Sequence, residues 1–234
     1  MFSLDPILKR IVDKINDESL RALTIDLVKN PSIHIGATTY TGLSLGTAPA
    51  SRRRHHSYPR GLIQHIVGSS KIALTLCDIV EQIYRSDVDR DVVLTAIVVH
   101  DVMKPLTYAL KGECFEASQL GERMDHLTLV VAELIRRGFP LEVVHAVAAH
   151  HGRSGPINPR TVEALICFLA DSTDADLNGE VLTAAKIMVE RCVDERIEGL
   201  NAEEACTIIH AHEKQGCGGV TSKLKEILES REST

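Results

Sequence analysis

The sequence contains few aromatic residues. Only 3% of its 234 residues are Phe, Tyr or Trp, and Trp is absent. Proteins that hold single-stranded nucleic acid usually stack the bases on aromatic side chains, so such a platform would be sparse here. The net charge of −6 also argues against a large nucleic-acid-binding surface. A small anionic ligand bound at a local cationic site remains compatible with this charge.

The sequence also lacks segments that enter or cross a membrane. Its first six residues do not have the apolar core of a signal peptide, and no apolar run approaches the length of a membrane span. The six cysteines form no C-x-x-C pair, and we interpret them as reduced thiols rather than as a disulfide framework. We therefore expect a soluble cytoplasmic protein with no membrane partner. The oligomeric state cannot be predicted.

Apolar residues recur at helical spacing through most of the chain, with no alternation typical of strands. This pattern predicts an all-α fold, and 44% hydrophobic residues are enough for a sizeable core. The expected helices cover residues 4–30 in two short pieces, 61–84, 89–100, 119–137, 140–151, 161–171, 181–192 and 203–212. Residues 111–118 are expected to form a loop.

A long segment from Ser32 to Pro59 shows no sustained period and is rich in Gly, Ser, Thr and Pro. Structureless connections of this length are uncommon in compact domains and are usually functional or disordered. The segment closes with a basic cluster, residues 52–56, which is either a solvated loop or a flap that brings cations to a phosphate. We accordingly divide the chain into residues 1–59, the N-terminal helices and an active-site loop, and residues 60–234, a helical domain.

Metal-ligating residue types stand at the inward faces or ends of several predicted helices. The apolar run Val92–Val99 leads directly into His100 and Asp101, and a buried carboxylate is costly unless it is paired or bound to a metal. Taken singly, each such residue is more often structural. Helical bundles nevertheless build metal sites from side chains on facing helices. The candidate ligands are His65, His100, Asp101, His126, His150, His151 and Asp171.

Mixed imidazole and carboxylate ligands suit Fe, Mn, Ni, Co or Zn. With seven candidates, and Asp101 able to bridge, one to two divalent ions are expected. Four other histidines lack this context. We interpret His34, His145, His210 and His212 as structural or exposed.

The order and spacing of His65, His100-Asp101, Lys104 and Asp171 resemble the HD-domain metal-dependent phosphohydrolases, over about residues 55–174. That superfamily is helical, which implies an HD-domain bundle preceded by short N-terminal helices and a long loop. The additional His126 and His150-His151 resemble the extra histidines of the binuclear branches of this superfamily, which include HD-GYP phosphodiesterases and HD-domain 3′→5′ exoribonucleases.

The entry segment His55–His65 and the pairing of His150-His151 with Asp171-x-x-Asp174 resemble the exoribonucleases in particular. Two positions depart from the pattern. Arg60 stands where that group commonly has glycine, and Met103 replaces the usual glycine before the lysine. The size and acidic balance are also similar to archaeal HD-domain enzymes that open a pterin 2′,3′-cyclic phosphate, although no motif singles them out.

The resemblance implies roles for individual residues. One ion would be held by His65, His100, Asp101 and Asp171, and a second by Asp101, His126, His150 and His151. Asp101 and Lys104 would be catalytic. Lys104, Arg54 and Arg60 would contact the substrate phosphate, and Asp174 would orient a ligand.

These roles predict a divalent-metal-dependent phosphodiesterase acting on a small nucleotide-like or cyclic phosphate. One alternative is a 3′→5′ exoribonuclease on single-stranded RNA, which the basic run at residues 52–56 favours and the low aromatic content opposes. Another is a ligand-binding HD module without turnover. Such degenerate modules usually lose some ligands, and none of the expected ligands is missing here.

Overall fold

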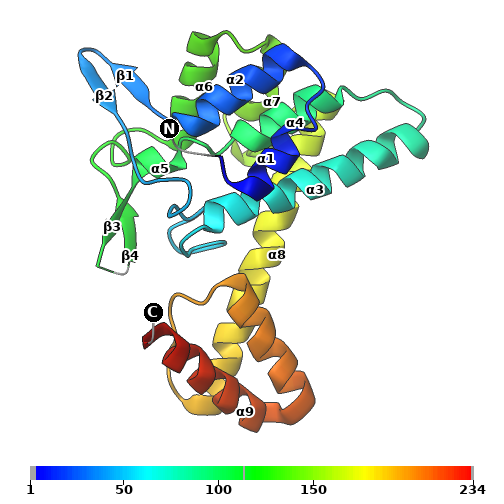
Figure 1. The fold of residues 1–234 in the computed structure, drawn as a ribbon. Helices are drawn as coiled ribbons and strands as arrows, with labels where there is room; N and C mark the ends of the chain where they lie inside the picture. The colour runs from blue at the N-terminus through cyan, green and yellow to red at the C-terminus, as the bar shows by residue number, and fades with distance from the viewer. Residues whose placement is uncertain (1–3, 113, 233–234) are drawn as a thin grey trace.

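Helices make up most of the chain, as the sequence predicts, and two short hairpins interrupt them (Figure 1). The structure, a computed structural model, describes residues 4–112 and 114–232. The helices are α1 Pro6–Val12, α2 Glu18–Lys29, α3 Gly61–Gln82, α4 Arg90–Val99, α5 Lys104–Thr107, α6 His126–Arg137, α7 Leu141–Ala148, the 3-10 turn η1 Gly152–Ser154, α8 Val162–Val193 and α9 Ala202–Glu232. The strands are β1 Ile33–Ile35, β2 Thr38–Tyr40, β3 Tyr108–Lys111 and β4 Cys114–Ala117.

The apolar residues divide into two clusters, and α8 contributes to both. The larger cluster contains residues of α1 to α4, α6, α7 and the first part of α8. The smaller one joins the second part of α8 to α9 and includes Tyr58 from the loop before α3. Figure 1 shows α8 running from the upper bundle into the lower helical unit.

The central helix of the larger cluster is α4, in which every residue from Val92 to Val99 is buried. Asp89 starts this helix by accepting hydrogen bonds from the backbone N–H groups of Asp91 and Val92, both at 3.0 Å. A helix that is apolar on all sides belongs inside a bundle. The residues that follow it, His100 and Asp101, are therefore delivered to the interior.

Several predicted helix boundaries are wrong, including the predicted end of the last helix at residue 212, since α9 continues to Glu232. Residues 119–125 are not helical, because the Asp125 side chain caps α6 by accepting from the Thr128 N–H at 2.7 Å, so that the helix begins at His126. The predicted break after Asp171 is also absent: α8 is continuous, and Asp171 lies inside it rather than at its end. Two polar residues that follow Asp171 in this helix, Asp174 and Asn178, are buried.

Both hairpins fall in segments that were expected to be loops. Strands β1 and β2 pair Ile33 with Tyr40, and β3 and β4 pair Tyr108 with Ala117. Strands of three or four residues are too short to display a convincing alternation. The loop after β2 packs against α5, where the Leu43 N–H donates to the Pro105 carbonyl at 3.1 Å.

The interpretation of all cysteines as reduced thiols is wrong for one pair. Cys192 and Cys217 form a disulfide that joins the end of α8 to α9. Their separation of 25 residues carries no sequence signal, because only the packing of α9 against α8 brings them together. Cys77, Cys114, Cys167 and Cys206 are free thiols.

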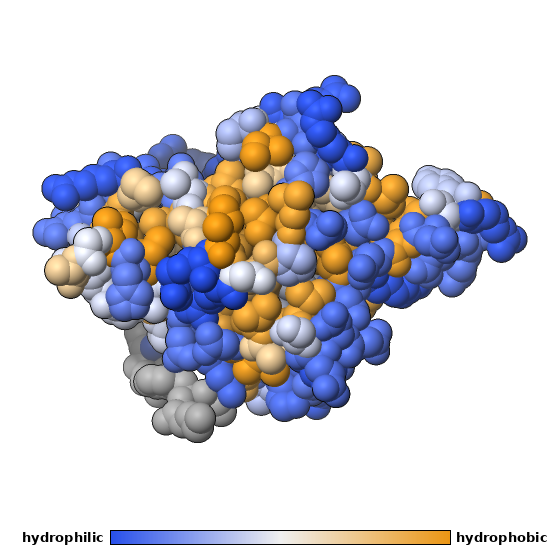
Figure 2. All heavy atoms as spheres, turned by 90° about the horizontal axis from the view of Figure 1, so that it is seen from above, coloured by the Kyte–Doolittle hydropathy of each residue, from blue (hydrophilic) through white to orange (hydrophobic). Residues whose placement is uncertain are grey.

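The surface is mixed rather than uniformly polar. Figure 2 shows hydrophobic residues surfacing between hydrophilic ones on the face seen from above. Some large apolar side chains are well exposed, among them Leu141 at 75%. Within the described residues, no helix combines the length and apolarity that crossing a membrane requires.

We predict that two leucine truncations on adjacent helices will differ sharply. Leu129 on α6 is fully buried in the larger cluster, whereas Leu141 begins α7 at the surface. Leu129→Ala should lower the free energy of unfolding by about 2–5 kcal/mol because it leaves a cavity. Leu141→Ala should stay within about 0.5 kcal/mol. Chemical denaturation followed by circular dichroism measures both, and equal losses would contradict the assigned core.

Candidate metal centre

Four side chains from three helical elements meet in the larger bundle. They are His65 of α3, His100 and Asp101 at the end of α4, and Asp171 of α8, and one ligand atom of each lies within 4.8 Å of the others. His65 Nε2 is 3.0 Å from Asp171 Oδ1 and 3.4 Å from Asp101 Oδ2. His100 Nε2 is 3.3 Å from the same Asp101 oxygen. We refer to these four residues as the first ligand group.

The ring nitrogens that face away from this group are each fixed by an acceptor. His65 Nδ1 donates to Asp174 Oδ2 at 2.7 Å, and His100 Nδ1 donates to the Ile97 carbonyl at 2.7 Å. Such outer partners set the tautomer of a metal-binding histidine and orient its ring. The Nε2 atoms are thus left facing the carboxylates.

A second ligand group lies beside the first. His126, His150 and His151 offer three nitrogens within 4.8 Å of one another. His150 Nδ1 donates to the Val147 carbonyl at 2.7 Å, which repeats the arrangement of His100. Asp101 connects the groups: its Oδ1 is 3.3 Å from His126 Nε2 and 3.9 Å from His150 Nε2. One oxygen of Asp101 therefore faces each group.

Two atoms at this junction are buried without a hydrogen-bond partner. Among the described residues, Asp101 Oδ1 and His126 Nε2 have none, and Thr95 Oγ1 is the one other such atom. Buried polar groups are normally satisfied, so an unpartnered carboxylate oxygen pointing at an unpartnered imidazole nitrogen needs an explanation. Divalent cations would satisfy both atoms, and the donor set fits transition ions.

The charge states agree with a site for cations. Burial opposes the charge on Asp101, yet His100 and Lys104 hold the pKa of this carboxyl well below its usual range. Burial likewise opposes protonation of His100, but Asp101 and Asp171 outweigh it and raise its pKa to about 9. In the second group, burial lowers the pKa of His150 to about 3 and that of His126 well below its usual value. The second group is thus neutral imidazole, the form that binds metals.

Lys104 lies directly against the first ligand group. Its Nζ is 2.5 Å from Asp101 Oδ2, and its side chain is only 10% exposed. Burial would lower the pKa of Lys104, but the charge of Asp101 reverses this and raises it. A fixed positive charge therefore stands beside the shared carboxylate.

The two arginines predicted to contact substrate are both at the surface. Arg60 pairs with Asp5 at 2.8 Å and is 55% exposed, and Arg54 is exposed. Arg60 also adopts a left-handed φ of 67°, a conformation that suits the glycine common at this position in the family it resembles. The basic residue with an electrostatic effect near the centre is Arg52, which acts on Tyr108.

Sequence reasoning missed three side chains around the centre. The ring of His55 is 5.0 Å from that of His65, and its charge interacts with Asp101 and Asp171. The backbone N–H of His56 donates to Asn178 Oδ1, and the His56 ring is 5.3 Å from that of His65. Burial raises the pKa of Tyr108, and the neighbouring charge of Lys104 opposes this shift. His55 and His56 had been read as part of a basic run, although their closeness to His65 in sequence was a usable signal.

Comparison with known proteins agrees with this geometry. Residues 62–176 match the HD domain family. The chain is 36% identical over 225 residues to the dihydroneopterin 2′,3′-cyclic phosphate phosphodiesterase of Methanocaldococcus jannaschii, covering 94% of this chain and 89% of that enzyme. It is 26% identical to the 3′-5′ exoribonuclease YhaM of Bacillus subtilis, and 32% identical to that of Listeria monocytogenes serovar 1/2a; both cover 56% of this chain and 43% of the exoribonuclease. No solved structure matches.

We predict that a methyl group at Gly68 will weaken metal binding. A Cβ there would lie 2.1 Å from Asp174 Oδ1, so the carboxylate must move and its bond to His65 is strained. Loss of such an outer partner costs about 10–100-fold in metal affinity. Competition with a chromophoric chelator measures this for Gly68→Ala. Gly46→Ala, where the nearest atom to a Cβ is Ser44 Oγ at 3.8 Å, is the control. Equal affinities in the two variants would show that Asp174 does not support the centre.

Proposed function

Because this chain belongs to the HD-domain family of metal-dependent phosphohydrolases, we propose that it is a phosphodiesterase that opens a 2′,3′-cyclic phosphate on a small pterin-like or nucleoside-like alcohol. We base the choice of substrate on how much of the chain is similar to each group of relatives. The likeness to the cyclic phosphate phosphodiesterase covers 94% of the chain, so it includes most of the region that follows the HD match. The likeness to the exoribonucleases covers little more than half.

Two ions are proposed for the two ligand groups. His65, His100, Asp101 and Asp171 would hold the first, and Asp101, His126, His150 and His151 the second. The candidates are Fe, Mn, Ni, Co and Zn. When bound, divalent ions in such a pair lower the pKa of a water molecule and neutralise charge on the phosphoryl oxygens.

The protein's own groups would prepare this chemistry. Asp101 is held at Oδ2 by His100 and Lys104, while its Oδ1 faces the second ligand group without a hydrogen bond, so the carboxylate enters the reaction already oriented. The ammonium of Lys104 would stabilise negative charge on the phosphoryl group as the P–O bond breaks. Preorganised charge of this kind is worth more in a water-poor site than in solution.

His55, Tyr108 and Arg52 would form the substrate-facing side of the centre. His55 is half-buried, and Arg52 lies on the exposed loop that approaches Tyr108. A single exposed cation and two polar rings suit one phosphate group with a small organic substituent. A long anionic strand would require a more extended basic surface.

A substrate panel tests this proposal. Purified metal-loaded protein is incubated with a pterin 2′,3′-cyclic phosphate, a nucleoside 2′,3′-cyclic phosphate and single-stranded RNA labelled at its 5′ end. We expect kcat/KM for the cyclic phosphates to exceed that for RNA, with each yielding a single monoester. Processive shortening of RNA with salt-sensitive affinity would instead favour the exoribonuclease. No turnover of any substrate would favour a binding module.

The shared carboxylate predicts a loss of both ions in one variant. Asp101→Asn removes the charge that faces both ligand groups while keeping the side-chain volume, so bound metal and activity should fall together. Asp176→Asn on α8 is the matched control, because Asp176 is exposed. Elemental analysis after gel filtration provides the metal content. Undiminished metal in Asp101→Asn would refute a shared ligand.

Substitution of Lys104 should have a different effect from substitution of a metal ligand. Lys104→Ala should lower kcat and kcat/KM together by about 10²–10³-fold, as for other lost electrostatic donors. Bound metal should stay near the wild-type level, because seven ligands remain. Lys111→Ala is the control, since Lys111 is exposed and pairs with Glu116. Loss of metal in Lys104→Ala would show that the lysine acts by holding Asp101 rather than by contacting the phosphoryl group.

A further inference from the structure

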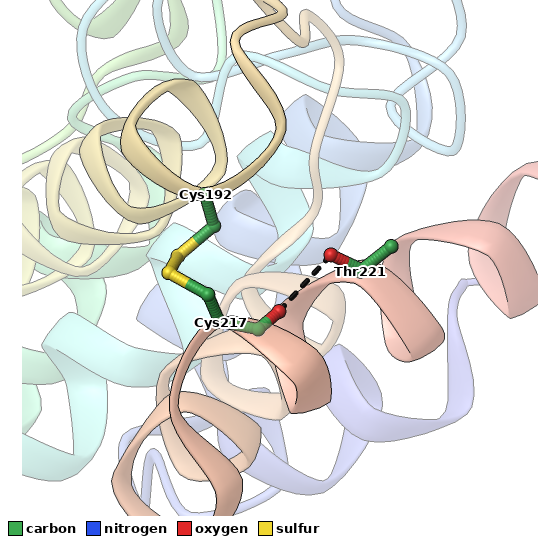
Figure 3. The surroundings of a disulfide bond; sticks show 3 residues. All are labelled: Cys192, Cys217 and Thr221. Atoms are coloured by element: carbon green, nitrogen blue, oxygen red, sulfur yellow. Dashed lines mark hydrogen bonds between the residues drawn. A yellow bond between two sulfur atoms is a disulfide. The ribbon is translucent and has the colours of Figure 1, made fainter.

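A second cluster of metal-ligating side chains lies in the C-terminal unit. Cys192 near the end of α8 and His212 and Cys217 of α9 each offer a ligand atom, all within 4.8 Å of one another. Figure 3 shows the two cysteines joined as a disulfide between these helices. None of these three residues belongs to the two ligand groups of the HD bundle, so this cluster is a separate site.

The backbone of α9 is built to bring these groups together. Gly216 interrupts the helix with φ 59° and ψ −147°, a conformation that is essentially restricted to glycine. The break separates His212, on the first segment of α9, from Cys217, on the second. Thr221 Oγ1 donates to the Cys217 carbonyl at 3.0 Å and so helps to start the second segment (Figure 3). Both side chains can therefore face Cys192.

We propose that the reduced pair Cys192 and Cys217, together with His212, binds a thiophilic divalent ion such as Zn²⁺. Two thiolates and one imidazole form a ligand set used by zinc sites, in which the fourth position is open to water. The exposure of the cluster agrees with an open position, since Cys217 is exposed while Cys192 and His212 are half-buried. This site is independent of the proposed phosphodiesterase activity.

The disulfide and the ion are mutually exclusive states of the same two sulfurs. A dithiol reductant would donate two electrons and two protons, breaking the S–S bond to give two thiols and leaving the reductant as its own disulfide. Binding of the ion would then release the two thiol protons, because thiolates are the ligands. Either state joins α8 to α9. The thiol–disulfide balance of the surroundings would therefore decide whether the site holds metal.

Cobalt provides a test that distinguishes this site from the HD centre. The full-length protein is reduced with dithiothreitol, desalted without oxygen and titrated with Co²⁺. Only thiolate ligands give a near-ultraviolet sulfur-to-cobalt charge-transfer band, and the ligand groups of the HD centre contain no cysteine. We expect the band in reduced protein, its absence in oxidised protein and its loss when Zn²⁺ is added.

Substitutions identify the ligands. Cys192→Ser and Cys217→Ser should each abolish the band. His212→Gln should weaken Co²⁺ binding by on the order of tenfold or more, while His210→Gln, two positions earlier on the same helix, should leave it unchanged. Cys206→Ser should also keep the band. A reduced protein without the band, or a band that survives in Cys192→Ser, would overturn the proposal and leave the pair as a disulfide only.

Discussion

The centre depends on the burial of one ionised carboxylate. Asp101 is 1% exposed, and taking such a charge out of water costs several kcal/mol unless it is compensated. The compensation comes from Lys104 and His100 on one oxygen and is incomplete on the other, where Oδ1 has no hydrogen-bond partner. The remaining requirement for positive charge is what makes this position a place for cations. Packing of α4 supplies the force that keeps the carboxylate there.

Helix ends provide the second element of the design. The last carbonyls of a helix lack partners within it and must find donors elsewhere. At the ends of α4 and α7 the donors are His100 Nδ1 and His150 Nδ1, each bonded to the carbonyl three residues earlier. One contact therefore satisfies the backbone and selects the tautomer that leaves Nε2 available. This explains why His100 and His150, one from each ligand group, are placed where an apolar helix stops.

The parts that sequence reasoning predicted are those with local signals. An apolar run that stops at His100-Asp101 is visible in one dimension, and so is the inward register of His65. The parts it missed depend on tertiary packing. The disulfide of Cys192 and Cys217 follows from how α9 folds back on α8, and the ion pair of Arg60 with Asp5 joins residues that are 55 positions apart in the sequence. The roles assigned to the candidate ligands remain predictions for the experiments above.

Because α8 is continuous, it places three polar side chains toward the centre and the loop before α3. Asp171, Asp174 and Asn178 occur at spacings of three and four residues, so they share one face of the helix. The first belongs to a ligand group, the second orients His65, and the third accepts the backbone N–H of His56. A helix that ended at Asp171 could not hold the loop that presents His55 to the centre. After Asn178 the same helix forms the second apolar cluster with α9, and this cluster includes Tyr58 from the loop before α3. The C-terminal helices therefore support the loop that carries His55.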